Sequence, residues 1–444
     1  MASDDHGTIP ETPAGTVLDT TAGPVTRRTF IKSASVAAGA LAAAQASITG
    51  AWAAGSDEIR IGLIGAGGRG TGAVQNAIKS SKGVRLVAMA ELFPDRLADS
   101  RKTLADKVGA AATVANDRAF TGLDGYKSVL QSDTNYIILA TPPGFRPEHL
   151  KASIEAGKHI FTEKPVAVDG PGIKTCLSLV DVAAQKKLLV GCGLQRHHQQ
   201  GYLDTIARIH DGAIGDIVAA RAYWNQGALW NRGRKPEWSD TEWQLRNWYY
   251  FTWLCGDHIV EQHVHNIDVV NWAMKAHPVR AMGTGGRQVR TGPEWGHIYD
   301  HFAVDFEYEN GVHLFSMCRQ QEGTAGSVSE ALVGSKGTCQ VNDYRITGPS
   351  AFDGGSIKRK ELDPYQQEHT DFIASIRKGE PVSDLKWVTE STASAIMGRE
   401  AAYTGKVVSF DDIVNSTTVL APPSIDLSAA LPTPPVPMPG ATTN

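Results

Sequence analysis

The chain has 444 residues, of which 42% are hydrophobic and 20% charged, and its formal net charge is −4 at pH 7. This length predicts two or three globular domains with a sizeable core, and the charge balance excludes a basic footprint for nucleic acid or an anionic membrane surface. The five cysteines form no CxxC pair and no zinc-ligand spacing, so neither a disulfide framework nor a structural metal is predicted.

The first 55 residues resemble an export leader, and we exclude them from the predicted fold. Residues 26–32 read TRRTFIK, which resembles a twin-arginine signal, and an alanine-rich apolar run follows at residues 34–44. Residues 51–53 supply the small residues that a leader peptidase requires. The apolar run is too short for a membrane span, so no stable membrane anchor is expected. The leader predicts the twin-arginine export machinery as a partner and a periplasmic or otherwise exported protein; the alternative is an N-terminal amphipathic helix.

The next stretch has the pattern of a strand, a glycine turn and a helix. Residues 58–64 are mostly apolar, and Gly65, Gly67 and Gly70 precede a helical pattern. In a dinucleotide-binding fold the first glycine allows a tight turn, the second lets the backbone approach a pyrophosphate, and the third lets helix and strand pack closely. The free N–H groups at the start of the helix would face the phosphates. The alternative is a glycine turn that serves packing alone.

A carboxylate follows the second predicted strand. The apolar run at residues 84–90 ends in Glu91, about twenty residues past the turn, where a carboxylate would meet the ribose hydroxyls. A carboxylate at this position repels a 2′-phosphate, which favours NAD as the cofactor, whereas the nearby Arg96 leaves NADP possible.

Short apolar strands alternate with helical stretches up to residue 193, as in a doubly wound, mostly parallel sheet. Two of these strands, residues 136–140 and 159–162, end in Thr141-Pro142-Pro143 and Glu163-Lys164-Pro165. Ligands in such sheets bind beyond the carboxyl ends of the strands, so these residues should share one edge with the glycine turn. We therefore predict an α/β Rossmann domain over residues 56–193.

The composition changes after this domain. The pattern of residues 194–415 predicts an α+β domain whose strands are largely antiparallel. A tryptophan-rich region at residues 224–253 is interpreted as a long ordered loop, and residues 257–274 as one helix. The last residues, 416–444, are rich in proline, alanine and threonine and are predicted to be disordered.

Three motifs, in this order, resemble the Gfo/Idh/MocA oxidoreductases, the family of glucose–fructose oxidoreductase and inositol dehydrogenase. They are the glycine turn at residues 65–70, Glu163-Lys164-Pro165, and residues 255–268, and the resemblance spans residues 58–410. It implies a Rossmann domain followed by an α+β domain with an open sheet. It also implies hydride exchange between NAD(P) and a secondary alcohol of a sugar or cyclitol, and a homo-oligomer formed through the open sheet.

Cofactor binding is predicted at the glycine turn and at the strand ends that share its edge. The residues are Gly65, Gly67, Gly68, Arg69, Gly70, Glu91, Thr141, Pro142, His149, Glu163 and Lys164. An exported enzyme has no ready supply of a dissociable nucleotide, so we expect the chain to hold its NAD tightly and to use it repeatedly.

Lys164 is the residue that we expect to move the proton. Oxidising a secondary alcohol requires removal of the hydroxyl proton as hydride leaves, and a lysine does this when burial and neighbouring charge favour its neutral form. The corresponding lysine has this role in the family that the chain resembles. The alternative is a surface lysine paired with Glu163.

Further candidates lie in residues 255–268. On one helix, Glu261 and His265 would share a face. The resemblance makes His265 a substrate ligand and the proton-relay partner of Lys164, and it makes the Glu261 carboxylate a ligand for substrate hydroxyls, so all three are catalytic candidates. Substrate contacts are expected at His197, Asp257, Glu261, His265 and Trp248.

This segment departs from the family pattern, which leaves other interpretations open. Glu261 replaces the usual aspartate, and Cys255, Asp257 and His263 stand where glycine is usual. A metal site is one alternative, but His263 and His265 are two residues apart and would lie on different faces of a helix, so no metal is predicted. The others are an NAD-dependent glycoside hydrolase, which oxidises its sugar transiently and eliminates the glycosidic substituent, and a non-catalytic sugar- or NAD-binding module.

Overall fold

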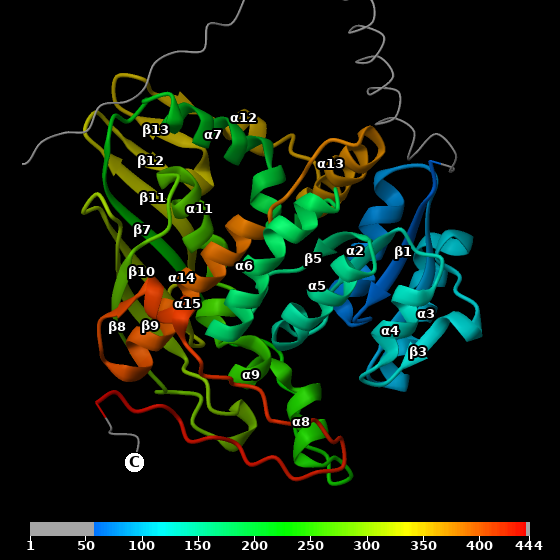
Figure 1. Cartoon of the computed structure of the whole chain (residues 1–444). Helices are drawn as coiled ribbons and strands as arrows, with labels where there is room; N and C mark the ends of the chain where they lie inside the picture. The colour runs from blue at the N-terminus through cyan, green and yellow to red at the C-terminus, as the bar shows by residue number, and fades with distance from the viewer. Residues whose placement is uncertain (1–56, 441–444) are drawn as a thin grey trace, which may run out of the picture. The chain divides into compact units, whose positions relative to one another are not determined.

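The computed structural model describes residues 57–440 (Figure 1). The predicted export leader and residues 441–444 lie outside the described residues. Between residues 57 and 440 the chain forms a six-stranded sheet and then a nine-stranded sheet. No helix in this part of the chain is long and apolar enough to cross a membrane.

The first sheet is parallel throughout, with the strand order β3-β2-β1-β4-β5-β6. Its strands are β1 (Ile59–Ile64), β2 (Val84–Glu91), β3 (Ala119–Thr121), β4 (Tyr136–Leu139), β5 (His159–Thr162) and β6 (Val190–Cys192). The helices that alternate with them are α2 (Gly68–Ser80), α3 (Pro94–Val108), α4 (Gly125–Gln131), α5 (Arg146–Glu155) and α6 (Gly170–Gln185). The predicted doubly wound Rossmann fold is confirmed.

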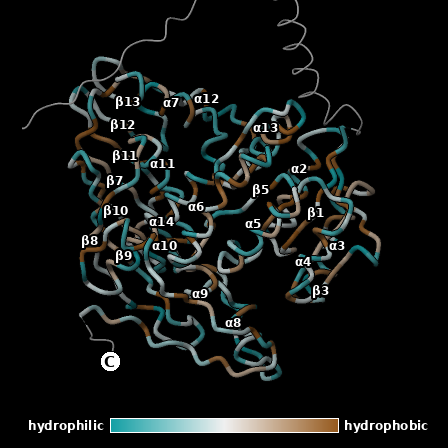
Figure 2. The backbone as a smooth tube through the Cα atoms, in the orientation of Figure 1, coloured by the Kyte–Doolittle hydropathy of each residue, from teal (hydrophilic) through white to brown (hydrophobic). Residues whose placement is uncertain are grey.

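Both faces of this sheet are buried, which explains why its strands are apolar without alternation. Along β4, Tyr136 and Ile138 belong to one apolar cluster, whereas Ile137 and Leu139 belong to another. Successive side chains of a strand point to opposite faces, so a single sheet supports two cores. The apolar colour along β1 and its neighbours in Figure 2 marks this layer.

The second sheet has the order β14-β13-β12-β11-β7-β10-β9-β8-β15, and only β7 and β10 are parallel neighbours in it. Its strands are β7 (Ile217–Gln226), β8 (Arg280–Gly286), β9 (His301–Glu307), β10 (His313–Gln320), β11 (Ser327–Gly334), β12 (Thr338–Gln340), β13 (Arg345–Thr347), β14 (Phe352–Asp353) and β15 (Val408–Ser409). The prediction of a second domain with a largely antiparallel, open sheet is confirmed.

The remaining helices differ in what they pack against. They are α7 (Gln200–His210), α8 (Asp240–Arg246), α9 (Thr252–Cys255), α10 (His258–Glu261), α11 (Val264–Met274), α12 (Gly355–Lys358), α13 (Pro364–Lys378), α14 (Leu385–Thr404) and α15 (Phe410–Asn415). Ile267 of α11 and Ala395 of α14 share a core cluster with Phe306 of β9. Phe372 and Ile373 of α13 instead belong to a core of the first sheet, so the end of the chain ties the two sheets together.

The predicted helix over residues 257–274 is divided into α10 and α11. Gln262 ends α10 with a φ of −115° and a ψ of −50°, and the His263 N–H donates to the His258 carbonyl at 3.2 Å, one residue further back than in an α-helix. This wider turn brings residues from the end of α10 and the start of α11 to one cavity.

The tryptophan-rich region is more regular than the predicted loop. It contains α8, α9 and a 3-10 turn at Trp248–Tyr250. Its aromatic side chains form a buried cluster that includes Trp243, Tyr250 and Phe251. Aromatic packing therefore orders a segment that its proline and polar content had suggested would be irregular.

The tail is also ordered, at least to residue 440, which corrects the prediction of disorder from residue 416. Residues 416–440 run as an extended segment beside α8 and α9, red in Figure 1. Leu427 and Leu431 pack on the aromatic cluster, and α8 donates from Thr241 Oγ1 to the Ala429 carbonyl at 3.1 Å and from Gln244 Nε2 to the Leu431 carbonyl at 2.7 Å. These contacts bury apolar side chains of the tail, which stabilises its position, and the amino-acid composition of the tail alone does not predict this burial.

The glycine turn gives a stability prediction. A Cβ at Gly70 would overlap the carbonyl oxygen of Gly65, where α2 crosses the end of β1, whereas a Cβ at Gly72 would meet no atom within 4 Å. We expect Gly70→Ala to lower the free energy of unfolding by about 1–3 kcal/mol or more. The matched control Gly72→Ala, on the same helix, should be neutral or stabilise by up to about 1 kcal/mol. Urea unfolding measures both, and equal stability of the two variants would contradict this packing.

Candidate active site

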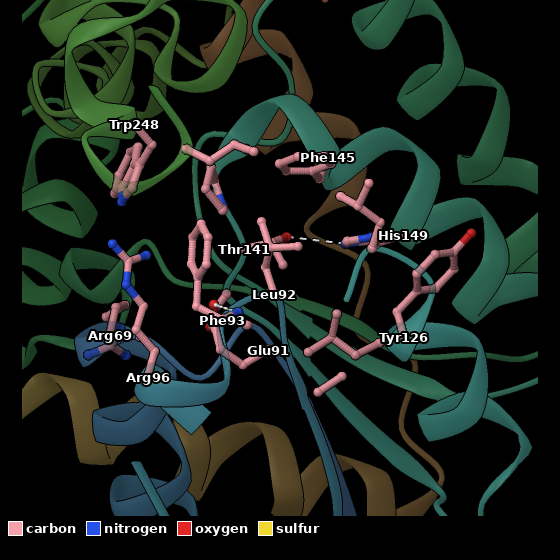
Figure 3. Close-up of a pocket in the computed structure, with 18 of the residues that line it drawn as sticks. Arg69, Glu91, Leu92, Phe93, Arg96, Tyr126, Thr141, Phe145, His149 and Trp248 are labelled. Carbon is pink, nitrogen blue, oxygen red and sulfur yellow. Dashed lines mark hydrogen bonds between the residues drawn. The ribbon is translucent and has the colours of Figure 1, made fainter. Parts of the chain in front are cut away.

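A first cavity opens at the carboxyl edge of the parallel sheet (Figure 3). Figure 3 shows Arg69, Arg96 and Trp248 on one side of it and Tyr126 and His149 on the other. Most of the predicted cofactor residues line it: Gly65, Gly67, Gly68, Arg69, Glu91, Thr141, Pro142 and His149. Three predicted residues lie elsewhere: Gly70 packs the helix against the strand, and Glu163 and Lys164 line a second cavity.

The glycine turn leaves backbone N–H groups open to the first cavity. No atom lies within 4 Å of the Cβ position at Gly67 or Gly68. The N-terminus of α2 has no side-chain cap and no acidic residue in its first turn. Unsatisfied N–H groups and the positive end of the helix dipole therefore face a space suited to an anionic group.

Glu91 lies at the end of β2, beside this turn. Its Oε2 accepts a hydrogen bond from the Ala66 N–H at 2.9 Å. Burial raises the pKa of its carboxyl, and the nearby Arg96 opposes that shift. The carboxylate thus supports the turn and also lines the cavity.

His149 and Arg146 come from the first turns of α5. Thr141 Oγ1 and His149 Nδ1 lie 3.1 Å apart, and burial lowers the pKa of His149 to about 3, which keeps the ring neutral. Arg146 is buried and its Nη1 donates to the carbonyls of Leu139 at 2.7 Å and Glu163 at 2.8 Å. Arg146 therefore holds the ends of β4 and β5 together, a role that the sequence analysis missed.

The second cavity adjoins the first and reaches into the second domain. The two share four wall residues, namely Arg69, Ala140, Thr141 and Trp248. The second cavity is also lined by Pro143, Arg146, Glu163, Lys164, Gly193, Gln195, Trp224, Glu261, Gln262, His265 and Tyr365. Lys164, Glu261, His265 and Trp248, which come from separate stretches of the sequence, thus meet in one place, as predicted for a shared site.

Lys164 lies between the two domains in this cavity. Its Nζ donates to the backbone carbonyl of Glu261 at 2.6 Å and lies 3.3 Å from Glu261 Oε1. Burial raises the pKa of the Glu261 carboxyl, and Lys164 opposes the shift. Glu261 Oε2 is buried and has no hydrogen-bond partner among the described residues.

His265 faces the same cavity as a neutral ring. Burial, and then the charge of Lys164, hold its pKa well below the usual range. Its Nδ1 is buried without a hydrogen-bond partner within residues 57–440, and its ring stacks on Trp224 with centroids 5.8 Å apart. A neutral imidazole with a free nitrogen can accept or pass on a proton.

Arg69 joins the glycine turn to the second cavity. Its Nε donates to Glu163 Oε1 at 2.5 Å and its Nη2 to Glu368 Oε1 at 3.2 Å. Its guanidinium lies 4.7 Å from the ring centroid of Tyr365. Glu163 is thus an anchor for Arg69, and the alternative in which Lys164 is a surface residue paired with Glu163 does not apply, because Lys164 contacts Glu261 instead.

Two predicted substrate residues lie outside both cavities. Asp257 is fully buried at the start of α10, where its Oδ2 accepts from the Tyr299 N–H at 2.8 Å and from the Tyr403 hydroxyl. His197 Nε2 lies 2.8 Å from Asp268 Oδ2 and lines a different cavity, beside Trp272. Both side chains turn toward buried hydrogen-bond partners, which corrects the prediction of substrate contacts there.

The histidine-rich segment does not converge on a metal. His263 Nε2 lies 2.7 Å from Ser316 Oγ, and the His258 ring packs against Phe302 with centroids 5.1 Å apart. Within residues 57–440, no group of three or more His, Cys, Asp or Glu side chains is arranged to hold a metal ion.

Several lining residues had no signal in the sequence analysis. Phe93, Phe145 and Tyr126 line the first cavity, and Gln262 and Tyr365 line the second. Phe145 lies a few residues past the end of β4, so its position could have suggested it, whereas Gln262 owes its role to partners on distant strands. Tyr365 comes from α13 and reaches the site only through the fold.

Comparisons with known proteins agree with this geometry. A family model described as an oxidoreductase family with an NAD-binding Rossmann fold matches residues 59–194, and one for the GFO/IDH/MocA C-terminal domain matches residues 202–340. The chain is 27% identical over 366 residues to inositol 2-dehydrogenase 3 of Saccharopolyspora erythraea, which covers 79% of this chain and 95% of that protein.

Solved structures share the fold. Scyllo-inositol dehydrogenase from Lactobacillus casei, solved with bound NAD(H) and scyllo-inositol, superposes with a TM-score of 0.61 at 19% identity, over 80% of this chain and 99% of that one. Levoglucosan dehydrogenase, solved with NADH and L-sorbose, gives 0.63 at 16% identity over 80% and 99%. Since the two family models together match more than half of its length, the chain belongs to the GFO/IDH/MocA family and is an NAD-dependent oxidoreductase.

Proposed function

We propose that this enzyme transfers hydride between NAD and a secondary alcohol of a cyclitol or sugar. One observation carries the proposal: Lys164, Glu261 and His265 line a cavity that shares four wall residues with the cavity of the glycine turn. A substrate in the second cavity would therefore lie beside the cofactor in the first. The inositol dehydrogenase names among its relatives support a polyol substrate.

The residues of the first cavity fit a dinucleotide. The open N–H groups at Gly67 and Gly68 suit a pyrophosphate, and the Glu91 carboxylate suits ribose hydroxyls. Bound NAD supplies the hydride acceptor or donor. The carboxylate of Glu91 disfavours a 2′-phosphate, so NAD is preferred to NADP.

Proton transfer falls to the residues of the second cavity. In our proposal Lys164 takes the hydroxyl proton during oxidation and returns it during reduction. His265 lines the same cavity as a neutral ring and can pass the proton on. Glu261 orients Lys164 by its backbone carbonyl, and its free carboxylate oxygen accepts from a substrate hydroxyl.

A glycoside hydrolase that oxidises its sugar transiently is the second candidate. It is favoured by Glu261 alone, since a buried carboxyl with a raised pKa and a free oxygen can protonate a leaving glycosidic oxygen. Assays on aryl glycosides separate the two functions, because release of the aglycone without net formation of NADH indicates hydrolysis.

We also propose that the enzyme is exported by the twin-arginine machinery to the periplasm and carries its NAD with it. The twin-arginine sequence at residues 26–32 supports export. Because that route carries folded proteins, the cofactor would be bound before export. Loss of the protein from the periplasmic fraction when Arg27 and Arg28 are replaced by lysine would support this, and unchanged fractionation would contradict it.

Contacts across the first cavity support tight retention of the cofactor. Leu245 and Trp248 of the second domain line this cavity. Arg246 lies between these two residues in the chain. Its Nη1 donates to Asp95 Oδ2 at 2.9 Å and its Nη2 to Asp95 Oδ1 at 3.2 Å. The Arg246 guanidinium also lies 3.9 Å from the centroid of Phe93. Arg246 therefore holds the tryptophan-rich region, which contains α8 and Trp248, against the first domain.

The proton role of Lys164 gives a kinetic prediction. We expect Lys164→Ala to lower kcat by about 10²- to 10⁴-fold, because general acid–base catalysis contributes that much, while NAD still binds. The control Lys174→Ala changes an exposed lysine of α6 that lines neither cavity and should act as the wild type. NADH absorbance on a panel of inositols and sugars measures both, and an active Lys164→Ala variant would disprove the assignment.

The Arg246 contact gives a prediction for cofactor release. We expect Arg246→Ala to speed the loss of NADH by about 2- to 10-fold, since a bidentate pair with a ring contact is worth on the order of 1 kcal/mol. The control Arg234→Ala removes a different pair, with Asp240 at 2.6 Å within the second domain, and should leave the rate unchanged. Stopped-flow NADH fluorescence measures the rate; identical rates would show that Arg246 does not retain the cofactor.

We finally propose a homo-oligomer formed through the outer face of the second sheet. Along β10, Leu314 and Cys318 are buried beneath the helices, whereas Phe315 and Met317 point outward and are 58% and 40% exposed. Other exposed apolar side chains of this sheet are Val218, Met282, Val328 and Val333. A patch of this kind is typical of an interface.

The apolar outer face gives a test of assembly. We expect Phe315→Lys to shift the protein from an oligomer to a monomer in light scattering, because it places a charge within an apolar interface. Leu362→Lys is the control, since Leu362 is 73% exposed but lies outside the strands. A wild-type monomer, or an oligomer that survives Phe315→Lys, would exclude this interface.

A further inference from the structure

The side-chain amide of Gln262 lines the second cavity next to Glu261. An amide has one acceptor oxygen and one donor nitrogen of almost equal size, so its orientation must be derived from its hydrogen-bond network. Two chains of hydrogen bonds end at Gln262, and each begins at a group that can only donate.

The first chain begins at Arg290. A guanidinium has no acceptor, so Arg290 Nη1 must donate to an oxygen, which is Gln320 Oε1 at 2.6 Å. The nitrogen of Gln320 therefore points the other way. It donates to the Tyr249 hydroxyl at 2.7 Å and to Gln262 Oε1 at 2.9 Å. Arg290 and Gln320 are buried, so water does not compete for these bonds.

The second chain begins at Trp224. An indole N–H is a donor only, and Trp224 Nε1 donates to Gln226 Oε1 at 2.9 Å. The nitrogen of Gln226 is then left to donate to Gln262 Oε1 at 3.1 Å. Both chains therefore require the oxygen of Gln262 to face the protein.

The consequence is a fixed donor in the substrate cavity. The oxygen of Gln262 accepts two hydrogen bonds, while its Nε2 has no hydrogen-bond partner within residues 57–440 and is not among the buried unpartnered atoms. Rotating the amide would set its N–H groups against two other amide N–H groups. The protein thus prevents Gln262 from acting as an acceptor toward the cavity.

We propose that Gln262 is a specificity-determining residue that donates a hydrogen bond to a substrate oxygen other than the reacting hydroxyl. This inference rests on the proposed oxidoreductase function. It favours polyols that present a hydroxyl or ether oxygen at that position. It disfavours analogues that present a hydrogen atom or an ammonium group there, since neither can accept.

The test combines one variant with a series of substrates. The wild type is first assayed on inositols, and the best substrate is compared with its monodeoxyfluoro and monodeoxy derivatives at each carbon. Fluorine accepts a weak hydrogen bond but cannot donate one. At one carbon, therefore, kcat/KM should fall in the order hydroxyl, fluorine, hydrogen.

In Gln262→Met the differences in kcat/KM between the hydroxyl, fluorine and hydrogen substrates should become small at the same carbon. KM for the parent inositol should rise about 5- to 100-fold, which is the cost of losing one such hydrogen bond, with a smaller change in kcat and unchanged NAD binding. Gln131→Met, at the exposed end of α4, is the control, because Gln131 lines neither cavity.

The outcomes separate the inference from the function on which it rests. If the wild type oxidises no inositol or sugar, the proposed function falls and the role of Gln262 with it. If the wild type is active but Gln262→Met keeps the parent KM and the same ranking at every carbon, the inference alone is wrong. A loss confined to kcat would also overturn it, since it would mean that Gln262 acts on the reaction without binding substrate.

Discussion

The contact between Lys164 and Glu261 is the interaction on which the site depends. Lys164 follows β5 of the parallel sheet and Glu261 ends α10 of the second domain, and the amine of one donates to the backbone of the other at 2.6 Å. A mostly buried amine needs acceptors, and this bond joins the two domains at the site. Arg69 adds a second link, between Glu163 at the end of β5 and Glu368 of α13. Its side chain lines both cavities.

The sequence predicts those parts of the site that depend on local backbone. The turn needs glycine at Gly65 because its φ is +94°, and at Gly70 because a Cβ there would overlap the Gly65 carbonyl oxygen, and both constraints are local. Glu91 and Lys164 lie at or just after strand ends that a hydrophobic run already marks. The family resemblance also predicts His265 as a residue of the site. Arg146, Gln262 and Tyr365 could not be predicted in the same way, because each owes its role to partners from distant parts of the chain.

The incorrect predictions have a common physical cause. The contacts that a residue makes with buried partners decide where its side chain lies, and the sequence pattern around that residue does not reveal those partners. Asp257 and His197 stand near the motifs, but their side chains find better acceptor or donor partners in the interior. The tail has the composition of a disordered segment, yet its leucines have an aromatic cluster to cover and its carbonyls have donors on α8. Neither the buried hydrogen bonds nor the packing of the tail can be predicted from sequence, because both depend on groups that only the fold brings together.

In the proposed reaction a polyol carbon in the second cavity exchanges hydride with NAD in the first. Oxidation of an inositol deuterated at its ring carbons, followed by mass spectrometry of the nucleotide, tests this most directly. The account predicts NADH one mass unit heavier than normal, with no label in the water. Unlabelled NADH, or label released to the solvent without reduction of NAD, would contradict direct transfer between the two cavities.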